Sequence, residues 1–172
     1  TLVEKVRAEG KKASGKKPMI RVSAATFVPK PHTPFQWTAR LDEQAQHERL
    51  DILRQGLNVK GLKFSWHDPR TGLLEAALSR GDRRTGKAIY QAWKLGCRFD
   101  AWTEHYNHEK WLQAFKDTGL EPAFYAGRER SIEELLPWSH IDAGVTPAFL
   151  KDELRRSMDG IDTPDCRVDT CN

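Results

Sequence analysis

The 172 residues lack any long apolar run, which limits where the protein can act. A membrane-spanning helix needs about 20 consecutive apolar residues, and no run here approaches that length. The amino-terminal residues also lack the pattern of a secretory signal peptide. With 38% hydrophobic residues and a mean hydropathy of -0.68, the composition predicts a polar, soluble protein with one substantial core and no membrane partner.

Cysteine is also scarce, with only Cys97, Cys166 and Cys171. Three cysteines do not form the disulfide framework of a secreted domain, so a cytoplasmic location is expected. Cys97 is interpreted as a packed residue. Cys166 and Cys171 lie in an acidic tail and look like half of a metal-binding cluster, which two cysteines cannot complete. Zinc spacing is absent among His105, His108 and His140.

Positive charge is in slight excess and is unevenly distributed. The net charge is +4, but residues 1–40 carry nine Lys and Arg against two Glu, a net +7. The remaining residues carry 19 basic against 22 acidic side chains. A basic segment can attract phosphate groups. The alternative is that the run GKKASGKK is a flexible, solvated stretch of lysines.

The most regular pattern in the chain is a strand that leads into a proline-rich loop. Alternation over residues 20–28 places apolar or small side chains on both faces, which predicts a strand that is buried on two sides. Pro29, Pro31 and Pro34 then stiffen the loop. A helix follows over 41–56, and a second strand over 62–66. This order predicts a βαβ unit with parallel strands and a right-handed crossover.

The rest of the chain is predicted to be mostly helical. We therefore expect an α/β, helix-rich fold, with the βαβ unit in 1–69, a helical extension in 70–160 and a disordered tail in 161–172. The expected helices are 2–9 (ended by Gly10), 73–80, one capped by Asp82 and ending near Gly96, 107–119, 131–137 with Ser131 and Glu134 as a capping box, and 146–160, with a short third strand at 123–125.

Two groups of polar residues follow the predicted strands. Lys30 and His32 are held between prolines, where a stiff loop would present them to an anion or to the edge of a cofactor at low entropic cost. The alternative is a rigid connector that only caps the core. His67 and Asp68 end the second strand, on the same sheet edge, and could act as a base with its orienting carboxylate. A simple turn at Asp68-Pro69 is the alternative.

A third candidate site is the run from Arg80 to Arg84. Arg80, Arg83 and Arg84 could together hold a phosphate or carboxylate, with Asp82 at the helix start. A surface cluster of salt bridges explains the same residues. The six tryptophans could stack nucleic-acid bases, but their positions favour packing in the core. The six are Trp37, Trp66, Trp93, Trp102, Trp111 and Trp138.

Several long motifs together resemble one enzyme family. The runs are VSAATFVPKPHTPFQW, KFSWHDPRTGLLEAALSRGDRR, AWKLGCRFDAW, LPWSHIDAGV and TPDCRVDTC. They are similar to the uncharacterised radical S-adenosylmethionine (SAM) proteins that carry an N-terminal cobalamin-binding-type domain. The resemblance covers nearly the whole chain and implies that it matches the C-terminal part of such a protein. Because the chain begins at Thr1 and stops just after Cys171, we expect a fragment.

The resemblance implies a site that is shared with other parts of a longer polypeptide. The full-length protein would hold a [4Fe–4S] cluster and SAM, with the use of cobalamin left open, and would generate a 5′-deoxyadenosyl radical. The resemblance makes 20–28 the last strand of a partial TIM-like barrel, with the backbone of Phe27, Val28 and Pro29 near the SAM adenine. The family's CxxxCxxC motif is absent here. No cofactor is therefore expected in this chain, and no catalysis by it alone.

Two alternatives of another class remain open at the level of the sequence. The chain could be an RNA-binding module of a modification enzyme that uses the basic start together with Arg80, Arg83 and Arg84. It could instead be a protein-interaction extension. An unpaired flank of the first strand would in addition favour a homodimer. The expected partners are thus the rest of its own polypeptide, RNA, or a second copy.

Overall fold

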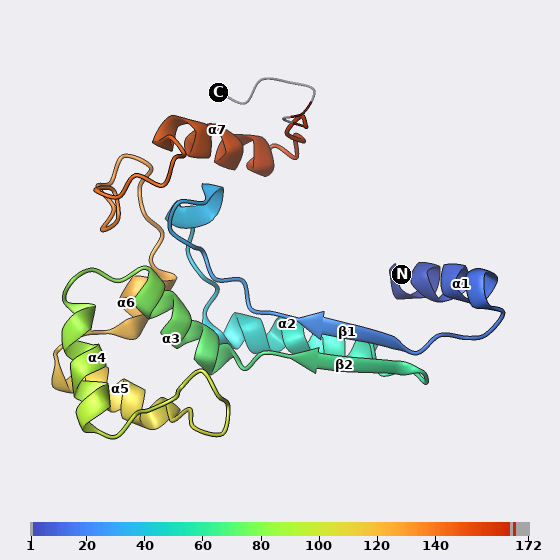
Figure 1. The fold of residues 1–172 in the computed structure, drawn as a ribbon, viewed down its shortest axis with the longest axis horizontal. Helices are drawn as coiled ribbons and strands as arrows, with labels where there is room; N and C mark the ends of the chain where they lie inside the picture. The colour runs from blue at the N-terminus through green and yellow to red at the C-terminus, as the bar shows by residue number, and fades with distance from the viewer. Residues whose placement is uncertain (1, 166, 168–172) are drawn as a thin grey trace. The chain divides into compact units, whose positions relative to one another are not determined.

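The computed structural model describes residues 2–165 and 167, and these form two compact units (Figure 1). The first unit contains residues 2–27 and 41–72, and the second contains residues 28–40 and the described residues from 73 onward. The proline-rich loop thus belongs to the second unit, although it follows a strand of the first. Among the described residues, every helix is too short or too polar to cross a membrane.

The first unit contains the predicted βαβ arrangement. Strand β1 (Ile20–Ala24) pairs in parallel with β2 (Leu62–Trp66), and α2 (Glu43–Gly56) connects them. The register runs from Ile20 opposite Leu62 to Ala24 opposite Trp66. Asp42 caps α2, since its carboxylate accepts a hydrogen bond from the amide of Ala45 at 2.7 Å. The prediction of a helix-rich α/β fold with a small parallel sheet is confirmed.

Helix α1 (Leu2–Ser14) continues past Gly10, so the predicted end at that glycine is wrong. A Cβ at Gly10 would lie 2.8 Å from Pro18, which indicates that this glycine permits a close approach of the chain. The helix ends instead before Gly15, which has a φ of +72° and donates its amide hydrogen to Lys11 at 2.8 Å.

Strand β1 is shorter and more exposed than predicted. It ends at Ala24 rather than at residue 28, and its residues alternate between half-buried and exposed. Strand β2 is similarly open, with Trp66 41% exposed. The expectation of a strand covered on both faces is therefore wrong for the described residues. Apart from Pro69, no apolar side chain of residues 2–27 and 41–72 is buried.

The second unit holds the hydrophobic core. Its elements are the 3-10 helix η1 (Pro34–Trp37), α4 (Thr85–Lys94), α5 (His108–Asp117), α6 (Pro122–Gly127) and α7 (Pro147–Met158), while α3 (Pro69–Ser79) begins in the first unit and ends in the second. Phe115 is 1% exposed in the largest cluster of buried residues. Cys97 lies in the same cluster, which confirms its prediction as a packed residue.

Capping residues explain where two helices of this unit begin. Asn107 accepts the amide hydrogen of Lys110 at 3.0 Å at the start of α5. Thr146 accepts from Phe149 at 3.2 Å at the start of α7, with Pro147 in its first turn. Both helices therefore begin where the sequence predicts.

Two other predicted elements are wrong. Residues 123–125 belong to α6 and form no strand, because Pro122 sits at its first turn and Glu121 accepts the amide hydrogen of Ala123. Residues 131–137 form turns rather than a helix. The expected capping box does not form there because Glu134 pairs with Arg128, with two hydrogen bonds of 2.7 Å.

Candidate functional site

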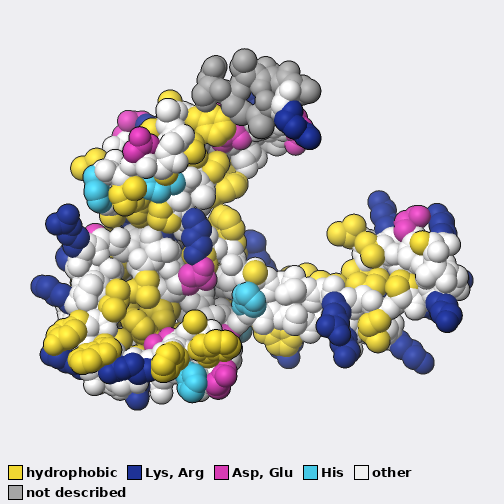
Figure 2. Space-filling model, in the orientation of Figure 1, with side chains coloured by type: hydrophobic (Ala, Val, Ile, Leu, Met, Phe, Trp, Pro, Cys, Tyr) yellow, Lys and Arg dark blue, Asp and Glu magenta, His cyan; other side chains and the backbone are white. Residues whose placement is uncertain are grey.

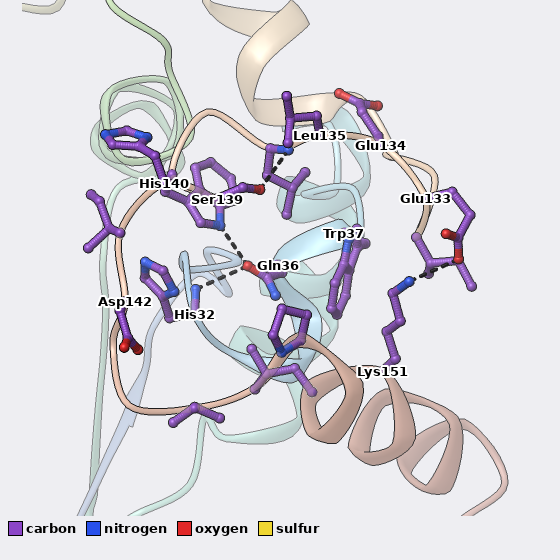
Figure 3. Close-up of a pocket in the computed structure, with 17 residues that line it drawn as sticks. His32, Gln36, Trp37, Glu133, Glu134, Leu135, Ser139, His140, Asp142 and Lys151 are labelled. Atoms are coloured by element: carbon purple, nitrogen blue, oxygen red, sulfur yellow. Dashed lines mark hydrogen bonds and ion pairs between the residues drawn. The ribbon is translucent and has the colours of Figure 1, made fainter.

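The second unit contains a cavity of about 500 Å³ beside the proline-rich loop (Figure 3). One part of its wall comes from residues 32–37 and the other from residues 132–151. The size and the mixture of aromatic, aliphatic and polar side chains are typical of a pocket for a small organic molecule. The lining residues are His32, Gln36, Trp37, Ile132, Glu133, Glu134, Leu135, Leu136, Trp138, Ser139, His140, Ile141, Asp142, Val145, Pro147, Leu150 and Lys151.

Gln36 connects the two parts of the wall. Its Oε1 accepts hydrogen bonds from the indole Nε1 of Trp138 at 2.6 Å and from the backbone amide of His32 at 3.1 Å. Gln36 and Trp138 are 4% and 6% exposed, so the bond between them is shielded from water, whereas the bond from His32 is partly buried. This contact between residues 102 positions apart fixes the loop on the later segment.

The base of the cavity is apolar. Trp37, Leu136, Trp138 and Leu150 form one cluster of buried residues, and α7 contributes Leu150. Ser139 closes the turn of this segment by accepting the amide hydrogen of Leu136 at 3.0 Å. The apolar base would favour a flat or branched hydrocarbon part of a ligand.

Polar groups lie around the mouth. His32, His140 and Asp142 lie on one side in Figure 3, and the ion pair between Lys151 and Glu133, at 2.9 Å, lies on the other. His32 has a φ of +57°, a backbone conformation that residues other than glycine rarely adopt. Such strain is concentrated at functional positions. The mouth can therefore offer both donors and acceptors to a ligand.

A buried arginine lies behind the loop, and this overturns one predicted role. Arg80 is fully buried, and its guanidinium donates to the backbone carbonyls of Thr38 and Arg128. Its own carbonyl accepts from Arg130 at 2.7 Å. Burial, together with the charges of Arg130 and Arg128, lowers the pKa of Arg80 to about 10. Arg80 is thus a structural cation that links three chain segments, not a group that can reach a phosphate.

The predicted anion site from Arg80 to Arg84 is consequently not assembled. Asp82 pairs with Arg84 at 2.7 Å, and this hydrogen bond lowers the pKa of the Asp82 carboxyl group. Asp82 lies three residues before Thr85, where α4 begins, so it is not the N-cap; its carboxylate accepts the amide hydrogen of Arg84 at 2.9 Å. Arg83 is exposed. The salt-bridge interpretation describes Asp82 and Arg84 better.

The residues expected near a cofactor are divided between the two units. Phe27 belongs to the first and is 58% exposed. Val28 and Pro29 belong to the second and are buried, with Val28 packed on Ala76 of α3 and Ala126 of α6. Lys30 pairs with Glu75 of α3.

His67 and Asp68, the predicted base and carboxylate after β2, do not act as a pair here, because Asp68 bonds to Arg70. Asp68 accepts two hydrogen bonds from the Nε of Arg70, at 3.1 and 3.0 Å, and one from its Nη2 at 2.6 Å. It also accepts the Arg70 amide hydrogen at 2.9 Å, where α3 begins. His67 is exposed, and its amide donates to Ala24 at 3.1 Å. These bonds favour the turn interpretation of Asp68.

Cys97, the one cysteine among the described residues, is not placed to bind an iron–sulfur cluster. Cys97 is buried in the core, where burial raises its thiol pKa. Cys166 and Cys171 lie outside the described residues. Across residues 2–165 and 167, no three or more His, Cys, Asp and Glu side chains gather in a way that could hold a metal ion. No catalytic step can be derived from a cluster in this chain.

Comparisons of the chain with protein-family models, curated proteins and solved structures find no match.

Sequence reasoning identified one side of the cavity and missed the other. The proline-rich loop was predicted as a site, and His32 lines the cavity. Gln36, Trp138 and Lys151 were not predicted, because nothing in their local spacing indicates that 132–151 lies on 32–37. The motif LPWSHIDAGV was the available signal, since it places Ser139, His140 and Asp142 after a tryptophan, between a proline and a glycine.

Proposed function

We propose that these residues form the carboxyl-terminal part of a radical SAM enzyme: the last strands of a partial barrel and a helical extension. The observation that supports this proposal is the open first unit. A parallel sheet is normally covered on both faces, yet here two parallel strands stand without a buried apolar side chain other than Pro69. Strands and helices from the rest of a barrel would supply the missing cover.

The chain's own residues would then have two roles. The β1–β2 pair would contribute barrel strands, and the backbone of Phe27, Val28 and Pro29 would lie near the SAM adenine. The cavity beside His32 and Trp138 would take part of the substrate. Because the cluster's cysteines would come from elsewhere in the polypeptide, the chain by itself would neither bind a [4Fe–4S] cluster nor cleave SAM. Its cytoplasmic location and its use of cobalamin stay predictions.

The test compares this chain with the product of its complete gene. Both are purified without oxygen, reconstituted with iron and sulfide, and incubated with SAM and a reductant. We expect 5′-deoxyadenosine and iron at the level of a [4Fe–4S] cluster only from the complete gene product. A complete product that holds no cluster, or one that leaves SAM intact, overturns the proposal.

A control variant separates real from adventitious iron. Changing both Cys166→Ser and Cys171→Ser in this chain removes the two tail thiols and leaves the buried Cys97 in place. Iron that disappears in this variant belongs to the tail. Stoichiometric iron that persists in it would contradict the expectation that this chain lacks a cluster site.

RNA binding is the second candidate, and one observation favours it. Lys11 and Lys12 of α1, with Lys16 and Lys17 just after it, are exposed, and Figure 2 shows Lys and Arg side chains around α1. Arg80 no longer supports it, because its guanidinium is buried. A tRNA gel shift at two salt concentrations tests it. Binding should weaken steeply with salt, and changing all four lysines to alanine should weaken it further.

A homodimer through the edge of β1 remains a prediction. An open strand edge can pair with another copy of the same chain. Sizing chromatography of the isolated chain checks it. A mass that stays monomeric over a wide range of concentrations would argue against such pairing.

A further inference from the structure

The second unit exposes an unusual group of aromatic side chains on α4 and the loop that follows it. Tyr90, Trp93, Phe99 and Trp102 are 58%, 52%, 73% and 62% exposed. This overturns the expectation that Trp93 and Trp102 pack in the core. Single exposed aromatic side chains are common, but several of them on one segment are more typical of a contact surface. We call these four residues the aromatic platform.

Two rings of the platform, those of Tyr90 and Trp93, stack on each other, and a cation lies over each of them. Tyr90 and Trp93 are nearly parallel, at 8° and 5.9 Å between ring centroids. Lys94 lies over the Tyr90 ring at 4.5 Å, and Arg98 lies over the Trp93 ring at 4.6 Å. The rings are therefore already held by cations, as in surfaces on which bases stack.

The side chains around the platform are mostly basic, although Asp100 and Glu104 lie in its loop and Arg84 is paired with Asp82. Residues 83–98 contain five basic side chains and no Asp or Glu. Figure 2 shows Lys and Arg interleaved with hydrophobic side chains at the lower left, where α4 and the loop after it lie. The phosphates of a nucleic acid would be attracted to these basic side chains. An acidic surface would repel the phosphates, and a neutral one would not attract them. The five are Arg83, Arg84, Lys87, Lys94 and Arg98.

The loop after α4 is built to hold one ring outward. Phe99 has a φ of +56°, which is strained for a side chain with a Cβ. Its carbonyl accepts the amide hydrogen of Trp102 at 2.9 Å, and its ring contacts His105 at 6.1 Å between centroids. A core contact does not explain this conformation, because the Phe99 ring is the most exposed of the platform.

We propose that the aromatic platform binds unpaired bases of a single-stranded nucleic acid, with the basic side chains of 83–98 on its phosphates. This inference deepens the second candidate function by assigning base contacts to a surface apart from the lysines of α1. Stacking on Tyr90 and Trp93 accepts any base, so the surface would bind with little sequence preference. The requirement for accessible base faces excludes a duplex as its ligand.

The test is fluorescence anisotropy with a labelled oligo(U) of about 12 nucleotides, measured with this chain at low and moderate salt. We expect binding that weakens with salt and that falls at least about tenfold in the double variant Tyr90→Ala, Trp93→Ala. Trp93→Phe keeps a ring and should retain most of the affinity. A duplex of equal length should bind much more weakly.

The matched control is Phe124→Ala. Phe124 is 48% exposed and lies under Arg128 at 5.1 Å, so it is an aromatic–cation pair outside the platform. Unchanged affinity in this variant supports the proposal. Equal affinity of the double variant and the wild type overturns it, as does a duplex that binds as well as oligo(U), or no binding at low salt.

Two further outcomes distinguish this proposal from RNA binding at α1 and from a protein interface. If the four-lysine variant loses binding while the platform variant keeps it, nucleic acid binds at α1 and the platform proposal fails by itself. If the platform variant changes only the oligomeric state in sizing chromatography, the surface is a protein interface and the proposal is overturned. Radical chemistry in the complete gene product is independent of both.

Discussion

The two units of this chain differ in what holds them together. The second has three clusters of buried residues, whereas the first has a parallel strand pair with Pro69 as its one buried apolar side chain among residues 2–27 and 41–72. Ile52, Met19 and Leu2 are 69%, 62% and 77% exposed. Regular hydrogen bonding alone thus defines the first unit, and packing defines the second.

This contrast shows that secondary structure and stability come from different parts of the sequence. Asp42 caps α2 and the strand register is regular, so local signals suffice to form the elements. Burial is what normally stabilises them. We therefore expect the first unit of the isolated chain to unfold at lower denaturant than the second, unless further strands cover it.

The largest expected loss of stability comes from removing a buried phenylalanine of the second unit, compared with a partly buried one of the first. Phe115→Ala should lower the free energy of unfolding of the second unit by about 3–5 kcal/mol, because its ring is 1% exposed. Phe64→Ala on β2 should cost less than about 1 kcal/mol, since its ring is only partly buried, against Trp66. Urea unfolding followed by circular dichroism measures both. Equal costs would mean that the first unit has a core after all.

The second prediction concerns the buried cation. Arg80→Met should cost about 2–4 kcal/mol, because it leaves the carbonyls of Thr38 and Arg128 without their donor. The control Arg83→Met changes an exposed residue of the same type and should stay within about 0.5 kcal/mol. Thermal unfolding compares the two. A loss in the first unit only, with the second unchanged, would contradict the linking role of Arg80.

The third prediction tests the contact that joins the loop to the cavity. Trp138→Phe keeps a ring but removes the indole N–H that Gln36 accepts, and should cost about 1 kcal/mol. Gln36→Leu alone should cost a similar amount or more, since His32 also donates to it. A double-mutant cycle measures the coupling. Strict additivity would show that the bond contributes nothing to the second unit.

The smallest effect is a pH dependence. Hydrogen bonding to Arg128 lowers the pKa of Glu134 below its ordinary value of 4.5, so the unfolded state binds more protons between the two values. Its contribution is present above pH 4.5 and is lost as pH falls through the lower, folded value. Because both side chains are about a third exposed, the effect is about 0.5–1 kcal/mol.

Glu134→Gln is the matching variant. The variant should be less stable than the wild type near neutral pH, and the two stabilities should converge as pH falls through the lowered pKa of folded Glu134. Chemical unfolding at several pH values measures this difference. A gap that widens in acid would reverse the assigned sign.

Local signals in the sequence predicted the elements of the fold well. The alternation before Trp66, the caps at Asn107 and Thr146 and the parallel order were sufficient for β2, α5 and α7. Two of the errors arose where one residue could serve two purposes. Gly10 permits a close approach to Pro18 rather than ending a helix, and Glu134 pairs with Arg128 instead of capping one.

Burial was harder to predict than secondary structure. Arg80 was assigned to an anion site because it lies beside Arg83 and Arg84 in the sequence, yet its guanidinium donates to the carbonyls of Thr38 and Arg128. Trp93 was assigned to the core because of its position in a predicted helix, yet it is 52% exposed. Such assignments depend on which segments meet, and this information is not local.

The bond between Gln36 and Trp138 has a consequence for the order of events during synthesis. The two residues are separated by 102 positions, which a ribosome covers in roughly 5–20 s at about 5–20 residues per second. Throughout that interval the loop residues that line the cavity lack their later partner. The final packing of the loop is therefore a late step, because Trp37 gains its buried neighbours Leu136, Trp138 and Leu150 only after those residues have been synthesised.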